Sequence, residues 1–203
     1  MKKFLLPFIV LISLAGLLIF SNSREKITNF PSSGTDVIAF GDSLVVGVGA
    51  SEKGGFVTIL SQELDLPIVN LGISGDTTAR ALERINTLDQ YKPKVVIVLL
   101  GGNDFLQGIP EVETFVNLEK IIYNIHKRGS AVLLLGLEDK KLGNKHRQSF
   151  DTLAEKTAVL YLPNILDGIY GNPTLSADTL HPNDAGYRII ANKIRPVLEK
   201  LTK

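Results

Sequence analysis

The sequence predicts an α/β fold, a three-layer α/β/α sandwich around a five-stranded parallel sheet. Five short apolar runs recur along the chain, and none of them alternates strictly between apolar and polar residues, which is typical of parallel strands buried on both faces. Helical stretches separate the runs, as they do when helices cover both faces of one sheet. With 203 residues, 44% of them hydrophobic, the chain is long enough for one compact domain.

The predicted strands and helices follow one another in regular order. The expected strands occupy residues 37–40, 68–71, 95–100, 131–135 and 158–162. The expected helices occupy residues 55–64, 77–88, 112–126, 145–156 and a last stretch from Asp184 to about Lys200. No internal repeat or low-complexity segment interrupts this order.

Two of the expected helices show clear apolar faces. In the helix at 77–88, four apolar residues share one side, and the polar residues, among them Arg80 and Arg84, are expected in solvent. We interpret this helix as ordinary scaffold. The last helix follows Pro182, takes Asn183 or Asp184 as its N-cap, and buries one apolar side.

The N-terminus has the pattern of an export signal. Lys2 and Lys3 precede an uncharged apolar stretch at 4–20. This stretch is longer than the ~7–15-residue core of a cleaved signal and at the low edge of the ~17–25 residues that span a bilayer. Residues 1–23 therefore predict a signal peptide or a membrane anchor, and the length favours the anchor. Residues 24–35 are rich in turn residues and predict a linker, with the domain at 36–203.

Composition excludes several classes of function. The chain has 22 basic and 21 acidic residues, so nothing indicates a nucleic-acid partner. The absence of cysteine excludes disulfides, thiol catalysis and cysteine-ligated zinc. We expect an exported monomer on the periplasmic or extracellular face, in contact with a membrane only if the N-terminal segment is retained.

Three polar blocks follow the first three predicted strands. They centre on Ser43, Gly75 and Asn103. Because the carboxyl ends of parallel strands meet at one edge of a sheet, we expect these residues to converge there. Ser43 and backbone N–H groups at a helix start would then lie together, which suits a serine nucleophile and a developing oxyanion.

The base and its partner are expected in the loop before the last helix. Asp178 precedes His181 by three residues, and Pro182 biases His181 toward an extended conformation. Asp178 can then bind Nδ1–H of the imidazole, leaving Nε2 to accept the proton of Ser43. The other two histidines, His126 and His146, are flanked by basic residues and are expected in solvent.

The same edge predicts an oxyanion site and an acyl site. Ser43 N–H, Gly75 and the Asn103 side chain are the candidate oxyanion donors, since glycine allows close approach and asparagine supplies an N–H. Apolar residues that flank these blocks are candidates for the acyl site, although a core or lid role is about equally expected for each. They are Ile73, Phe105, Leu106 and Ile109.

Taken together, these blocks resemble the SGNH hydrolase, or GDSL esterase/lipase, superfamily. The matching blocks are Gly41-Asp42-Ser43-Leu44, Ser74-Gly75-Asp76-Thr77, Gly101-Gly102-Asn103-Asp104 and Asp178-x-x-His181-Pro182. They are most similar to the branch of bacterial exported arylesterases and multifunctional thioesterase/lysophospholipases. The resemblance implies a flavodoxin-like sheet, no cofactor, no metal, a Ser43–His181–Asp178 triad, and hydrolysis of small acyl-ester, thioester or lysophospholipid-like substrates through an acyl-enzyme.

Other functions remain open at this point. The aspartates of the blocks and His181 could bind a metal in a phosphoesterase, although aspartates at strand ends frequently cap helices. The domain could also be a carbohydrate O-acyl esterase or acyltransferase, or an anchored binding domain without catalysis. The ordinary α/β-hydrolase fold is disfavoured, because Ser43 lacks the Gly-x-Ser-x-Gly elbow.

Overall fold

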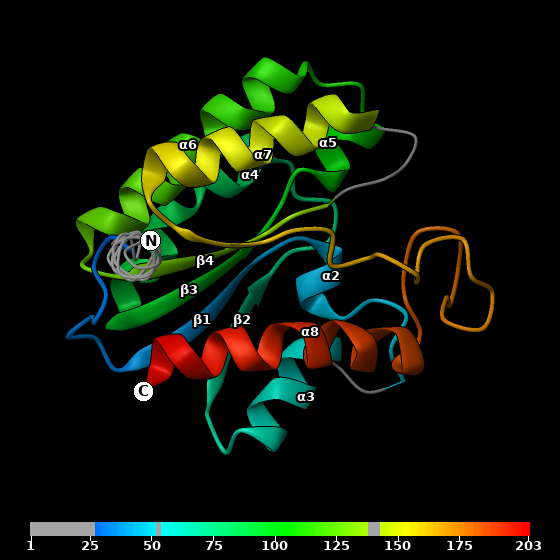
Figure 1. The fold of residues 1–203 in the computed structure, drawn as a ribbon, viewed down its shortest axis with the longest axis horizontal. Coiled ribbons are helices and arrows are strands. Elements are labelled where there is room, and N and C mark those ends of the chain that lie inside the picture. The colour runs from blue at the N-terminus through cyan, green and yellow to red at the C-terminus, as the bar shows by residue number, and fades with distance from the viewer. Residues whose placement is uncertain (1–26, 52–53, 138–142) are drawn as a thin grey trace, which may run out of the picture.

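The computed structural model describes residues 27–51, 54–137 and 143–203, and a five-stranded parallel sheet forms the centre of this part of the chain (Figure 1). The strand order is β2-β1-β3-β4-β5, which is the flavodoxin-like order. The prediction of a five-stranded parallel α/β/α sandwich is confirmed. The strands are β1 (Asp36–Gly41), β2 (Ile68–Gly72), β3 (Pro93–Leu99), β4 (Ala131–Leu135) and β5 (Leu160–Leu162).

Helices cover both faces of the sheet, as Figure 1 shows. One face packs against α3 (Gly55–Glu63) and α8 (Asp184–Thr202). The other packs against α4 (Thr78–Glu83), α6 (Glu111–Lys127) and α7 (Gly143–Thr157). Successive residues of β1 point to opposite layers, and both layers are apolar. This two-sided burial explains why the strand sequences do not alternate between apolar and polar residues.

Helix α8 begins as predicted, and the structure decides between the two candidate caps. Asn183 is the N-cap, and its side chain accepts a hydrogen bond from the backbone N–H of Gly186 at 3.1 Å. One turn into the helix, the buried Tyr187 donates its hydroxyl to the carbonyl of Val48 at 2.7 Å. Helix α8 is thereby tied to the chain that follows the first strand.

The predicted continuous helix at 77–88 is wrong. Helix α4 ends at Glu83, Arg84 leaves the helical conformation, and a 3₁₀ helix, η1 (Ile85–Gln90), follows. A 3₁₀ helix has three residues per turn, so side chains three apart point the same way. Ile85 and Leu88 are three apart, and both are buried against the sheet.

Two short helices were outside the predictions, and the last strand is shorter than predicted. The helices are α2 (Ser43–Val46) and α5 (Gly102–Leu106), and β5 has three residues where five are predicted. Helices of one turn are too short to produce a hydrophobic period. At the start of β5, Ala158 has a φ of 49°, which breaks the extended conformation before the strand begins.

Residues 27–35 do not form a free linker. They run along the N-terminal edge of the sheet, where Thr28 bonds to Ala158, Ser32 to Gly129 and Thr35 to Lys92. The side chain of Asn29 donates to the carbonyls of His126 and Ser130 at 2.8 and 3.2 Å. Residues 27–35 of the predicted linker are thus bonded to carbonyls at the ends of helices and strands.

The predicted signal or anchor at 1–23 lies outside the described residues, as do residues 24–26. Among the residues described, none of the helices is both long enough and apolar enough to cross a bilayer.

Candidate active site

The candidate site lies at the carboxyl ends of the first three strands. Ser43 is the first residue of α2, one residue beyond the end of β1. Gly75 follows β2, and Asn103 is the second residue of α5 after β3. A Cβ on Gly41 would collide with the carbonyl of Leu99 on the neighbouring strand. Because Gly41 has no side chain, β1 can pair with β3 through its last residue.

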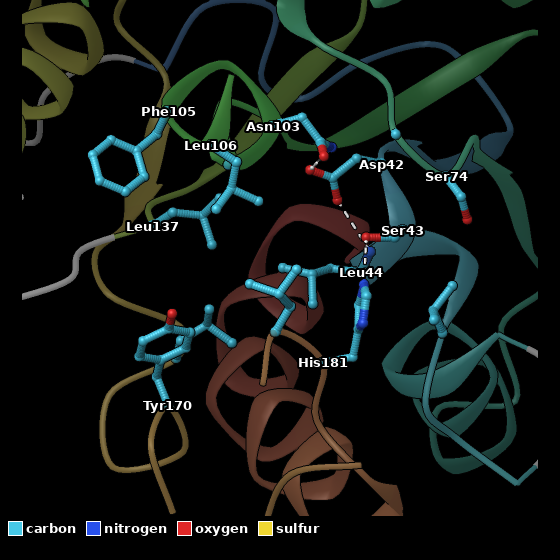
Figure 2. Close-up of a pocket in the computed structure, with 15 residues that line it drawn as sticks. Asp42, Ser43, Leu44, Ser74, Asn103, Phe105, Leu106, Leu137, Tyr170 and His181 are labelled. Carbon is cyan, nitrogen blue, oxygen red and sulfur yellow. Dashed lines mark hydrogen bonds between the residues drawn. The ribbon is translucent and has the colours of Figure 1, made fainter. Parts of the chain in front are cut away.

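Ser43 and His181 come together across 138 residues of sequence. The distance from Ser43 Oγ to His181 Nε2 is 3.0 Å (Figure 2). On the other side of the ring, His181 Nδ1 lies 2.8 Å from Asp178 Oδ2. This is the geometry in which imidazole, held by a carboxylate, can take a proton from a serine hydroxyl.

Asp178 is held in place by its own loop. Its Oδ1 accepts hydrogen bonds from the backbone N–H groups of Leu180 and His181 at 2.7 and 2.8 Å. The hydrogen bond from His181, and then those two backbone bonds, lower the pKa of Asp178 to about 2. The carboxylate therefore stays ionised at neutral pH and favours the tautomer with the proton on Nδ1, although half of its side chain is exposed.

Asn103 and Gly75 lie beside Ser43, around the same cavity. The side-chain amide of Asn103 donates to the carbonyl of Asp76 at 2.9 Å and to Asp42 Oδ2 at 3.3 Å. Gly75 has a φ of 81°, in the left-handed region that favours glycine.

Asp42 is a buried carboxyl between these groups, with 2% of its surface exposed. As the N-cap of α2, it accepts the backbone N–H of Leu44 at 3.0 Å. Burial raises the pKa of Asp42 to about 6, against the opposing effects of the Leu44 bond and of His181. Its second oxygen reaches Asn103, as the dashed line in Figure 2 shows.

A mainly apolar cavity of about 290 Å³ opens beside Ser43 and His181. Of the four apolar residues predicted for an acyl site, Phe105 and Leu106 line it, whereas Ile73 and Ile109 are absent from its described lining. Figure 2 shows Phe105, Leu106, Leu137 and Tyr170 grouped on one side of the cavity. The lining residues not predicted from sequence include Leu44, Val48, Leu137, Leu166, Tyr170 and Leu180.

The prediction that the other two histidines lie in solvent is wrong. His146 is 8% exposed and packs edge-on against Phe115 and Phe150, at ring distances of 5.4 and 5.3 Å. His126 is half-buried, and burial lowers its pKa. His126 lies on α6 and His146 on α7. Basic residues next to each histidine in these amphipathic helices made it look exposed in the sequence, although its own position faces inward.

The aspartates of the motif blocks are bound to donors of the protein itself. Asp76 pairs with Arg84 at 2.6 Å, and Asp104 accepts both the backbone N–H and the hydroxyl of Thr78. Within the described ranges, no three His, Asp or Glu side chains lie together in a way that could hold a metal ion. These carboxylates therefore organise the loops of the site.

A serine bound to a carboxylate-held histidine, at the ligand-binding edge of a flavodoxin-like sheet, defines the class of serine hydrolases. Residues 39–189 match the GDSL-like Lipase/Acylhydrolase family, and the chain belongs to that family. The protein is thus a GDSL-type serine esterase that acts on carboxylic ester bonds.

The chain is similar to curated proteins of the same kind along most of its length. It is 31% identical to Esterase TesA of Pseudomonas aeruginosa over 81% of this chain and 88% of the relative. It is 29% identical to Thioesterase 1/protease 1/lysophospholipase L1 of Escherichia coli over 81% of this chain and 84% of that protein. A crystal structure of TesA has a TM-score of 0.75 to this chain at 29% identity, covering 82% and 99% of the two chains.

Proposed function

We propose that Ser43 is the nucleophile, His181 the general base and acid, and Asp178 the residue that orients His181. The observation that supports this most directly is the 3.0 Å distance between Ser43 Oγ and His181 Nε2, with Asp178 on the opposite ring nitrogen. We propose further that the N–H groups of Ser43, Gly75 and the Asn103 side chain bind the oxyanion.

The reaction follows from these roles in two steps. Ser43 Oγ bonds to the carbonyl carbon while its proton passes to His181 Nε2, and His181 returns that proton to the departing alcohol or thiol as the ester bond breaks. A water then attacks the acyl-enzyme and gives a proton to His181. The bond to Ser43 Oγ breaks, the serine recovers its proton, and a carboxylic acid leaves.

The substrate is an ester or thioester whose acyl group is apolar and of short to medium length. The cavity beside Ser43 is mainly apolar, and its volume of about 290 Å³ is at the lower end of the ~300–1,000 Å³ usual for small-molecule sites. Names of relatives include thioesterase and lysophospholipase, and both activities use the chemistry proposed here.

Turnover of p-nitrophenyl esters by residues 24–203 tests this proposal. We expect butanoate and octanoate esters to be hydrolysed faster than the hexadecanoate ester. Ser43→Ala should fold normally and lose turnover, and a serine-directed phosphonate should block the wild-type protein in a one-to-one ratio. Turnover that survives in Ser43→Ala would refute the assignment of the nucleophile.

We also propose that the enzyme is exported and that residues 1–23 hold it in a membrane as a monomer. The support is the sequence of this segment, with Lys2 and Lys3 before an apolar stretch at 4–20. Mass spectrometry of the full chain after expression in a bacterium with an export pathway tests this. An intact N-terminus in the membrane fraction supports the anchor, whereas cleavage near residue 23 supports a signal peptide.

A further inference from the structure

Arg84 occupies a position that its sequence context does not suggest. The pattern of the helix predicts this arginine on the solvent side of a scaffold element. The structure places it at the end of α4, with 15% of its side chain exposed. Its guanidinium lies over the ring of Phe40, with Cζ 4.2 Å from the ring centroid. It does not belong to the described lining of the catalytic cavity.

The guanidinium joins two chain segments that lead into the site. Nε donates to Asp76 Oδ2 at 2.6 Å, and Nη2 donates to the carbonyl of Gly41 at 3.0 Å. The Gly41 carbonyl also accepts the backbone N–H of Ile73 at 3.0 Å. One side chain thus connects the end of β1 with the loop that follows β2.

Both partners of Arg84 adjoin the candidate oxyanion donors. Gly41 is two residues before Ser43, and Asp76 follows Gly75 directly. The backbone carbonyl of Asp76 also accepts the 2.9 Å hydrogen bond that orients the amide of Asn103. The spacing of all three donors therefore depends on where Arg84 holds Gly41 and Asp76.

We propose that Arg84 is a positioning residue for the oxyanion site, which sets the spacing of Ser43, Gly75 and Asn103 without touching the substrate. This inference rests on the proposed function, because it takes these three groups as the oxyanion donors. A displacement of about 1 Å at a reacting centre can cost roughly 10²-fold in rate. The rate of the reaction therefore depends strongly on the positions of the three oxyanion donors.

Arginine suits this position better than lysine would. Its planar fork directs two N–H groups to two acceptors at the same time, and its flat face stacks on an aromatic ring. A lysine ammonium is a point charge on a flexible stem, so it can bind Asp76 or the Gly41 carbonyl without fixing their separation. The conservative substitution is therefore expected to restore only part of the function.

The experiment compares Arg84→Ala and Arg84→Lys with wild type in the purified full chain. Arg80→Ala is the matched control, because Arg80 lies in α4 one turn before Arg84, is exposed, and makes no side-chain hydrogen bond or ion pair within the described residues. We expect Arg84→Ala to lower kcat by roughly 10²-fold with KM within about threefold, as loss of transition-state binding predicts. Arg84→Lys should be intermediate, and Arg80→Ala should match wild type within about twofold.

Two further measurements separate positioning from loss of the fold. Titration with a serine-directed phosphonate counts the competent sites: we expect the same stoichiometry in Arg84→Lys and wild type, with slower reaction in the variant. In the Asn103→Ala background, Arg84→Lys should lower kcat by a clearly smaller factor than it does alone, because Arg84 then has one donor fewer to position.

The outcomes are distinct. Wild-type kcat in a folded Arg84→Ala variant, a loss of kcat that equals the loss of titratable sites, or fully multiplicative effects with Asn103→Ala would each overturn this inference. Absence of esterase activity in the wild-type chain, or activity in Ser43→Ala, would overturn the proposed function instead. Arg84→Lys keeps the charge and volume, so it provides the decisive comparison if Arg84→Ala does not fold.

Discussion

The buried carboxyl of Asp42 makes hydrogen bonds that join two loops of the site, but its burial disfavours the charged form. Its oxygens accept hydrogen bonds from Leu44 N–H and from the Asn103 amide, so it joins the nucleophile block to the asparagine block. Its burial disfavours the charged form, and its pKa rises from 3.8 to about 6. Between these values the folded protein holds a proton that the unfolded chain has released, so the free energy of unfolding falls as pH rises.

The variant Asp42→Asn tests this linkage, since it keeps the shape of the side chain and removes its titration. The difference in free energy of unfolding, variant minus wild type, should increase from about pH 4 to about pH 8 by up to about 3 kcal/mol, at ~1.4 kcal/mol per pKa unit. Urea unfolding curves across this range provide the measurement. A difference that stays constant with pH would show that Asp42 is not protonated in the folded state.

The carboxylate of Asp178 is expected to matter for turnover more than for stability. Asp178→Asn keeps the size of the side chain but can favour the wrong tautomer of His181, and kcat should fall by roughly 10²–10⁴-fold. Since the pKa of Asp178 is lowered to about 2, its own protonation should not contribute to the pH dependence of kcat/KM above about pH 4. Steady-state kinetics of both proteins measures this. Unchanged turnover in the variant would remove Asp178 from the mechanism.

The three histidines should separate into one catalytic and two structural residues. His181→Ala should lose turnover, while His146→Ala should keep kcat within about twofold and lower the free energy of unfolding by about 2 kcal/mol, because it empties a buried site between Phe115 and Phe150. Thermal unfolding and p-nitrophenyl ester kinetics on the same samples check both parts. Loss of turnover in His146→Ala at full stability would contradict this separation.

Among the elements, the 27–35 segment differs most from what its composition indicates. Asn29 has a φ of 58°, and its side chain satisfies two carbonyls at the ends of α6 and of the turn before β4. The segment is therefore hydrogen-bonded to residues near the N-terminal ends of the strands. The predicted helix at 77–88 differs in a similar way. Ala81 and Ile85 are buried as its apolar period predicts, but the helix ends at Glu83, and Arg84 bonds to Asp76 and to the carbonyl of Gly41 on other elements.

Two substitutions at Asn29 separate the side-chain bonds from the backbone conformation. Asn29→Ala should destabilise by about 2–3 kcal/mol, since it loses the hydrogen bonds and places alanine in the left-handed region. Asn29→Gly loses the same bonds without the backbone penalty, so it should be destabilised by about 1 kcal/mol less than alanine. Chemical unfolding of residues 24–203 measures both. Equal stability of the wild type and the two variants would mean that the segment does not contribute to the fold.

At the scale of the whole molecule, residue 27, where the described chain begins, and the active site lie at opposite ends of the strands. Residue 27 precedes Thr28, which bonds to Ala158 before the start of β5. Helix α2, which begins at Ser43, follows the carboxyl end of β1 (Figure 1). A strand of six residues spans ~20 Å. The cavity therefore opens at the end of the sheet opposite to residue 27.

This arrangement predicts that tethering does not restrict access to a dissolved substrate. The full chain in liposomes and residues 24–203 in solution should hydrolyse p-nitrophenyl butanoate with kcat/KM values within about threefold of each other. Outward-facing molecules are counted with a membrane-impermeant serine-directed phosphonate. A tenfold or larger loss of kcat/KM in the tethered form would mean that the entrance faces the bilayer.

Much of the fold was predictable because its signals are local. The five apolar runs, the order of strands and helices, and the start of α8 each depend on residues that are neighbours in sequence, through burial on both sheet faces and through the preference of asparagine and aspartate for N-caps. The convergence of Ser43, Gly75 and Asn103 was predictable for a related reason, since successive parallel strands end at one edge.

The sequence alone therefore determined the class of fold, the family, and the set of polar residues at the edge of the sheet. Only the tertiary structure decided the inward position of Arg84, the burial of His146, the packing of 27–35 and the part of the cavity formed by Leu166 and Tyr170. Each of these depends on partners distant in the chain, and a long polar side chain can face solvent or a buried acceptor from the same local pattern. Whether such a side chain turns inward depends on the free energy gained by hydrogen bonding to buried carbonyls and carboxylates. Those buried acceptors form only when the helices and strands pack together.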